Sequence, residues 1–232
     1  MGRTPGPTPP PIERPNIVLI FADDMGWADA SMNGGRFATP GKDRLAQEGA
    51  RFESVYVAAP LCSPSRASLL TGQYPPVTGV PWNYLHNDDE VEGTEGRLLP
   101  DQIAIGEVLR EAGYRTAAIG KWGVGAPDDL STWPVNWGFD YSYGPVDRPQ
   151  TGVFFENDHL TEDRAQPWEL AEKNSRLALD FIAQAPDAPF FVIHRPPRSP
   201  HPLQPGPRHR SRPPRCERSS APRAARQAWG GR

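Results

Sequence analysis

Three short apolar runs, each next to a helical pattern, constrain the fold of this chain more than any other feature. Residues 16–21, 116–119 and 190–193 are runs of apolar and β-branched residues, apart from the asparagine at 16, and such runs are typical of strands inside a mainly parallel sheet, buried on both faces. Helical patterns at 101–112 and 168–184 alternate with them. We therefore predict an α/β fold, a mixed and mainly parallel sheet with helices on both faces, whose site residues lie at the carboxyl ends of strands.

Four further segments complete the predicted order of elements. Thr39 and the proline after it can begin a helix over 39–48, which the glycine at 49 would end. Residues 51–57 alternate in polarity and predict a strand. The segments 78–99 and 127–163 are long, polar and rich in aromatic residues, so we expect them to be loops that face a substrate.

The net charge of -3 conceals two different compositions. Residues 1–193 carry 15 Lys+Arg against 27 Asp+Glu, whereas the last 39 residues carry ten Arg, one Glu, nine Pro and no Lys. A segment with this composition and no apolar periodicity does not build a core. We predict a disordered lead-in at 1–14, a catalytic domain at 15–193 and an Arg/Pro-rich tail at 194–232 that is disordered or read out of frame.

The N-terminal segment has no apolar run of the kind that signal peptides carry, and no other segment is long and apolar enough to cross a membrane. We therefore expect a cytoplasmic protein without a membrane partner. The two cysteines, Cys62 and Cys216, are too few and too far apart for a disulfide framework or a Cys-rich metal site.

A helix start near Cys62 carries a pattern that folding alone does not require. Pro64 suits the first turn of a helix, Ser63 can cap it, and the apolar residues at 67–70 would bury it. Cys62 and Arg66 would then lie at the N-terminal end, where backbone N–H groups and a guanidinium attract an oxyanion. Cys62 is thus a candidate nucleophile, against the alternative of an inert buried thiol.

Charged residues follow two of the predicted strands. Asp23 and Asp24 come directly after the first apolar run, and adjacent carboxylates repel each other unless a cation or Arg and Lys side chains neutralise them. Their oxygens suit Ca²⁺ or Mg²⁺. Lys121 follows the second run. The alternatives are a helix cap with a solvated carboxylate for the aspartates and a solvated strand-end lysine for Lys121.

These segments together resemble the type I, formylglycine-dependent sulfatases. The stretch from Cys62 to the glycine at 72 resembles their signature C-x-P-S-R followed by L-T-G, the segment 15–26 resembles their opening strand, and 113–123 resembles their lysine-bearing block. The resemblance covers roughly residues 15–193 and implies the N-terminal part of an alkaline-phosphatase-like fold.

The resemblance implies a sulfuric ester hydrolase. A formylglycine-generating enzyme would convert Cys62 to formylglycine, whose hydrate is the nucleophile in that family. Asp23, Asp24 and the residue at position 62 would bind Ca²⁺ or Mg²⁺, and Arg66 and Lys121 would stabilise the transferring group. The substrate would be a small sulfate ester or a sulfated glycan.

Two departures from the family pattern bear on activity. Gly123 stands where a histidine is commoner, and His201, in a segment resembling a proline-flanked histidine of the family, falls in the tail. No second acidic ligand pair and no second lysine follow residue 193, so we expect a truncated chain with impaired activity. The alternatives are a phosphonate or phosphodiester hydrolase of the same superfamily, or a non-catalytic fragment whose basic tail binds polyanions; nucleic acid is the less favoured partner.

Overall fold

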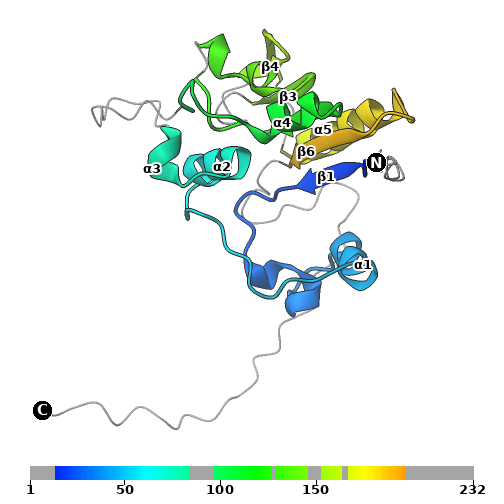
Figure 1. The fold of residues 1–232 in the computed structure, drawn as a ribbon. Coiled ribbons are helices and arrows are strands. Elements are labelled where there is room, and N and C mark those ends of the chain that lie inside the picture. Colours follow the sequence, from blue (N-terminus) through cyan, green and yellow to red (C-terminus); the bar gives the residue numbers. More distant parts are fainter. Residues whose placement is uncertain (1–13, 84–96, 127–128, 146–152, 164–166, 197–232) are drawn as a thin grey trace, which may run out of the picture. The chain divides into compact units, whose positions relative to one another are not determined.

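The computed structural model describes residues 14–83, 97–126, 129–145, 153–163 and 167–196 (Figure 1). The strands are β1 (Ile17–Ile20), β2 (Arg115–Gly120), β3 (Tyr141–Pro145), β4 (Val153–Glu156), β5 (His159–Glu162) and β6 (Phe190–Arg195). The α-helices are α1 (Pro40–Glu48), α2 (Cys62–Thr71), α3 (Pro75–Thr78), α4 (Ile105–Glu111) and α5 (Pro167–Ala183). The 3-10 helices are η1 (Trp27–Asp29), η2 (Ser31–Asn33), η3 (Leu130–Thr132) and η4 (Pro134–Trp137).

The six strands form one sheet in the order β1-β6-β2-β3-β4-β5. The first four strands in this order are parallel, and β4 and β5 are antiparallel additions at one edge. β6, the last strand among the described residues, lies between β1 and β2, where Phe191 is opposite both Ile17 and Thr116. The predicted mixed, mainly parallel sheet is confirmed.

Helices cover both faces of the sheet, as predicted (Figure 1). Side chains alternate across a strand, so odd and even positions of β6 enter different clusters. Phe190 and Val192 pack with α5, which contributes Ala178 and Phe181. The opposite cluster joins the strands to α2, α4 and a group of aromatic residues: Phe191, Ile193, Ala118, Ala67, Leu70, Trp122, Trp133, Trp137 and Phe139. No helix among the described residues is long and apolar enough to span a membrane.

Burial of β1 on both faces is the first prediction that the structure corrects. Ile17 and Leu19 pack against the cluster that contains α2, but Val18 and Ile20 are 51% and 57% exposed. The cause is the position of β1 at the edge of the sheet, because α5 packs on β2, β6 and β3.

The strand predicted at 51–57 is absent from the structure. Phe52, Val55 and Tyr56 are each at least 75% exposed. Alternating polarity describes a half-buried strand only when a neighbouring strand satisfies its backbone groups, and no described strand pairs with this segment.

The prediction of a loop over 127–163 is also wrong, because this segment contains η3, η4 and the strands β3 to β5. β4 and β5 form a hairpin in which Asn157 adopts a left-handed conformation at φ 56°. β5 is largely exposed, so its sequence carries little apolar signal.

The predicted helices are present, although some of their ends differ from the prediction. α1 begins after Thr39 and ends before Gly49 as expected, although the Thr39 side chain makes no capping bond. α2 has Leu61 rather than Ser63 at its N-cap position. α4 begins at Ile105, later than the predicted residue 101.

Candidate active site

The predicted site residues converge at one end of the parallel strands. Asp23 and Asp24 follow β1, Lys121 follows β2, and the carboxyl ends of parallel strands meet at one edge of a sheet. The start of α2 brings Cys62 and Arg66 to the same place, because hydrogen bonds join Arg66 both to Asp23 and to the backbone of Lys121.

Asp23 is the centre of this cluster. Its Oδ1 accepts a hydrogen bond from Arg66 Nη2 at 2.8 Å, and its Oδ2 lies 3.4 Å from Lys121 Nζ. The Arg66 side chain is fully buried, that of Asp23 is 9% exposed and that of Lys121 is 20% exposed. Arg66 also donates through Nη1 to the Lys121 carbonyl oxygen at 2.6 Å, so one buried guanidinium links the segments that follow β1 and β2.

These contacts keep Asp23 ionised. Burial on its own raises the pKa of Asp23, but the charges of Arg66 and Lys121 and the hydrogen bonds from Arg66 and Cys62 outweigh burial and hold this pKa below its usual value. The predicted neutralisation of a carboxylate by Arg and Lys side chains is therefore present at Asp23.

A possible cation position lies beside this carboxylate. One ligand atom from each of Asp23, Asp24 and Cys62 lies within 4.8 Å of the others. Asp24 adopts φ 53°, a left-handed conformation that Asp tolerates better than most residues. Carboxylate oxygens suit Ca²⁺ or Mg²⁺ in kind, whereas the thiol sulfur of Cys62 is a soft ligand that suits neither ion.

Gly123 has a structural reason to lack a side chain. Its φ is +72°, and an added Cβ would lie 3.1 Å from Arg66 Cδ. A larger residue would be strained in this backbone conformation and would press on Arg66. The glycine at this position, where a histidine is commoner in the family, therefore fits the way in which Arg66 is packed.

Sequence reasoning missed two residues of this cluster. Asn83 Oδ1 accepts from the backbone N–H of Ser63 at 3.0 Å and so satisfies one of the unpaired donors at the start of α2; no sequence signal marked it. Arg195 ends β6, which runs past the predicted domain end at 193. A charged residue at the carboxyl end of a buried strand was a usable signal for Arg195. His201 lies outside the described residues.

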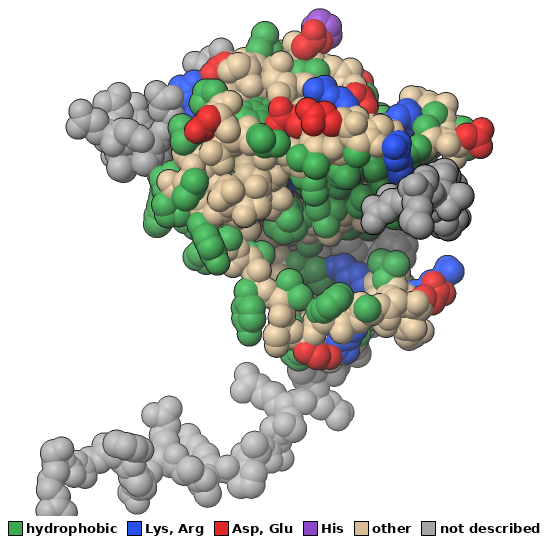
Figure 2. All heavy atoms as spheres, viewed as in Figure 1, with side chains coloured by type: hydrophobic (Ala, Val, Ile, Leu, Met, Phe, Trp, Pro, Cys, Tyr) green, Lys and Arg blue, Asp and Glu red, His purple; other side chains and the backbone are tan. Residues whose placement is uncertain are grey.

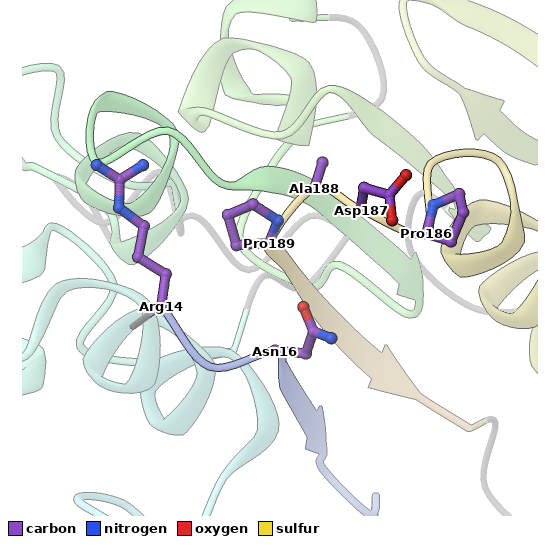
Figure 3. A pocket seen from close by; sticks show the side chains of 6 residues that line it. All are labelled: Arg14, Asn16, Pro186, Asp187, Ala188 and Pro189. Carbon is purple, nitrogen blue, oxygen red and sulfur yellow. The ribbon is translucent and has the colours of Figure 1, made fainter. Parts of the chain in front are cut away.

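A cavity of about 380 Å³ lies elsewhere, lined by Arg14, Asn16 and residues 186–189 (Figure 3). These residues precede β1 and β6. The cavity is thus at the amino ends of the strands, opposite the cluster around Asp23, and contributes nothing to the candidate site.

Comparisons with known proteins agree with this geometry. A family model described as Sulfatase matches residues 15–225. Arylsulfatase H of Canis lupus familiaris is 43% identical over 138 residues, covering 56% of this chain and 24% of that protein. N-acetylgalactosamine-6-sulfatase of Mus musculus is 35% identical over 202 residues, covering 77% of this chain and 38% of that protein.

A solved structure has a similar fold. The crystal structure of Ps i-CgsB in complex with k-i-k-neocarrahexaose superposes with a TM-score of 0.69 at 31% identity and covers 83% of this chain. The chain spans 47% of the length of that structure, so it matches less than half of each of these three relatives.

Proposed function

Because the chain belongs to the sulfatase family, we propose that the cluster around Asp23 is part of a sulfuric ester hydrolase site in which Cys62 is the precursor of the nucleophile. The observation that carries this proposal is the convergence on one carboxylate of Cys62 and Arg66, both from α2, and of Lys121, which follows β2. The family match does not favour the phosphonate or phosphodiester hydrolase.

A divalent cation, Ca²⁺ or Mg²⁺, would be held by Asp23, Asp24 and the residue at position 62. The two carboxylates fit such an ion in kind, and conversion of Cys62 to formylglycine would replace its sulfur with oxygen, the ligand type that these ions prefer. When bound, the cation supplies positive charge that polarises a sulfate oxygen.

Arg66 and Lys121 have different roles in this proposal. Arg66 is fully buried and holds Asp23 and the Lys121 backbone in place, so it positions the ligands. Lys121 is partly exposed beside Asp23, which allows its ammonium to stabilise negative charge on a bound sulfate group. Preorganised donors of this kind typically contribute about 3 kcal/mol each to a transition state.

The proposed substrate is a sulfate ester, with sulfated glycans as the favoured class. The name of N-acetylgalactosamine-6-sulfatase and the oligosaccharide bound to Ps i-CgsB support this choice. The proposal also requires a formylglycine-generating enzyme as a partner during synthesis.

Peptide mass spectrometry tests the proposal. The chain is co-expressed with a formylglycine-generating enzyme, and the peptide containing position 62 should carry the aldehyde. Cys216, which has neither Pro nor Arg in the matching positions after it, is the internal control and should stay a thiol. A wholly unmodified Cys62, under conditions that convert a control sulfatase, contradicts the proposal.

A further inference from the structure

Arg195 is a buried cation at the edge of the candidate site. Its side chain is 2% exposed. Nη1 donates to the carbonyl oxygens of Lys121 at 3.2 Å and Trp122 at 3.0 Å, and the guanidinium carbon lies 5.2 Å from the centre of the Trp122 ring. Arg195 therefore contacts the segment that carries Lys121.

The other two guanidinium nitrogens of Arg195 have no hydrogen-bond partner. Nε and Nη2 are buried and make no hydrogen bond in the structure. These two nitrogens form one edge of the guanidinium. An edge of this kind donates two parallel hydrogen bonds to two oxygens of a carboxylate or sulfate. A buried unpaired donor destabilises a folded protein, so a guanidinium edge without hydrogen-bond partners is suited to an oxyanion.

The local charge balance also favours an anion. Arg66 donates to the same Lys121 carbonyl oxygen as Arg195, and Arg66 Nε is buried without a partner as well. Asp23 forms ion pairs with Arg66 and Lys121, and no ion pair of Arg195 occurs among the described residues. Burial and then the charge of Arg66 lower the pKa of Arg195 well below its usual value, which Asp23 only partly offsets.

We propose that Arg195 is an anion-binding residue of the candidate site, whose Nε–Nη2 edge binds a sulfate oxyanion beside Lys121. The inference rests on the proposed function in naming sulfate as the anion. Protein atoms enclose this edge, so entry of the anion requires neighbouring side chains to move.

Arg115 provides a matched control. It begins β2, at the opposite end of the strand from Lys121, and it likewise donates through Nη1 to one carbonyl oxygen, that of Phe181, and lies over the Phe181 ring. Arg115 is only partly buried. Unlike Arg195, it has no buried side-chain nitrogen that lacks a hydrogen-bond partner.

Calorimetric titration with sodium sulfate tests the inference. The chain with unmodified Cys62 is used in EDTA, with sodium chloride at matched ionic strength as the reference. We expect sulfate to bind the wild type, to bind Arg195→Met at least tenfold more weakly, and to bind Arg115→Met as it binds the wild type. Equal sulfate affinity in Arg195→Met and the wild type overturns the inference, as does the absence of binding to the wild type.

Two further arms keep the test decisive. If Arg195→Met does not fold, Arg195→Lys keeps the charge but lacks the paired donors, and it should also bind at least tenfold more weakly. Crystals of the wild type soaked in selenate should show an anomalous peak beside Arg195 Nε, and a peak only elsewhere overturns the inference. Neither arm uses formylglycine or turnover, so failure of the proposed function is seen separately, in the mass spectrum of the Cys62 peptide.

Discussion

Asp23 connects the chemistry of the candidate site to the stability of the fold at the scale of single residues. Its carboxylate pairs with Arg66, which is fully buried, and with Lys121, which is not. A buried ion pair gives little net stability, but removing one partner leaves a buried charge without compensation. Arg66 is therefore expected to be the most sensitive position of this cluster.

Replacing Arg66 with methionine should lower the free energy of unfolding by about 3 kcal/mol, because Asp23 then remains buried without its main counter-charge. Urea denaturation measures the change. The double variant Arg66→Met with Asp23→Asn should recover part of the loss. Arg44→Met is the control, since Arg44 pairs with Glu48 on an exposed face of α1 and should cost less than about 0.5 kcal/mol. Equal losses in the two single variants contradict the prediction.

His194 should make stability depend on pH. Burial lowers the pKa of His194, and its Nε2 is buried without a partner. The unfolded chain, with an ordinary pKa near about 6.5, then binds more protons than the folded chain. Stability is full above this pH and falls as the pH decreases toward the folded-state pKa. Urea denaturation at pH 7.5 and 5.5 should show a larger loss for the wild type than for His194→Gln.

The exposed His159 is the control for this pH effect. His159→Gln should lose as much stability between the two pH values as the wild type does. A His194→Gln variant with the wild-type loss contradicts the assignment.

The site was predictable from the sequence wherever its residues are local or end a strand. Cys62 and Arg66 lie on one helical turn, and Asp23 and Lys121 each follow an apolar run. Arg195 was not predictable as a buried residue, because its burial depends on Trp122 and the segment around it. Asn83 was not predictable either, since it reaches α2 from beyond α3.

At the scale of elements, local pattern identified the strands that have parallel neighbours on both sides. β2 and β6 were found from their apolar runs. The segment 51–57 has the alternating polarity of a strand but pairs with no described strand. In contrast, β5 pairs with β4 but lacks the apolar pattern of a strand. Pairing is a property of the assembled sheet, so sequence periodicity alone could not separate these cases.

Gly138 should be a position between two elements that tolerates no side chain. It follows η4 with φ +83°, and an added Cβ would lie 2.1 Å from the backbone nitrogen of Glu107 in α4. Gly138→Ala should therefore cost roughly 4 kcal/mol, through backbone strain and displacement of α4. Gly72 ends α2 at φ +69° with nothing near its Cβ position, so Gly72→Ala should cost only about 1 kcal/mol. Thermal denaturation measures both, and equal costs contradict the argument.

At the scale of the whole molecule, β1 forms the apolar edge of the sheet, opposite the edge formed by β5. Figure 2 shows apolar side chains gathered at the surface near this strand, and Val18 and Ile20 are each more than half exposed. An apolar edge strand is a site of self-association.

The double variant Val18→Thr, Ile20→Thr should reduce self-association, because it lowers the apolar character of this edge while keeping β-branched residues in the strand. Light scattering against protein concentration measures the effect. Ile103→Thr is the control, since Ile103 is also exposed at 67% but lies outside the sheet and should leave association unchanged. Association that persists in the double variant shows that another surface drives it.

Turnover is the property that depends on the whole set of residues at once. The described part of the chain offers Asp23, Asp24 and position 62 to a cation, whereas Ca²⁺ takes about 6 to 8 oxygen ligands, so we expect weak Ca²⁺ binding by calorimetry.

Groups that act as a unit lose most of their effect when several members are missing. The formylglycine-bearing chain should therefore hydrolyse an aryl sulfate slowly or not at all, and fusion to the part of a relative such as arylsulfatase H that this chain does not match should raise the rate. Rapid turnover by the 232-residue chain alone, abolished by Cys62→Ala, contradicts this expectation and would show that the residues of this chain suffice.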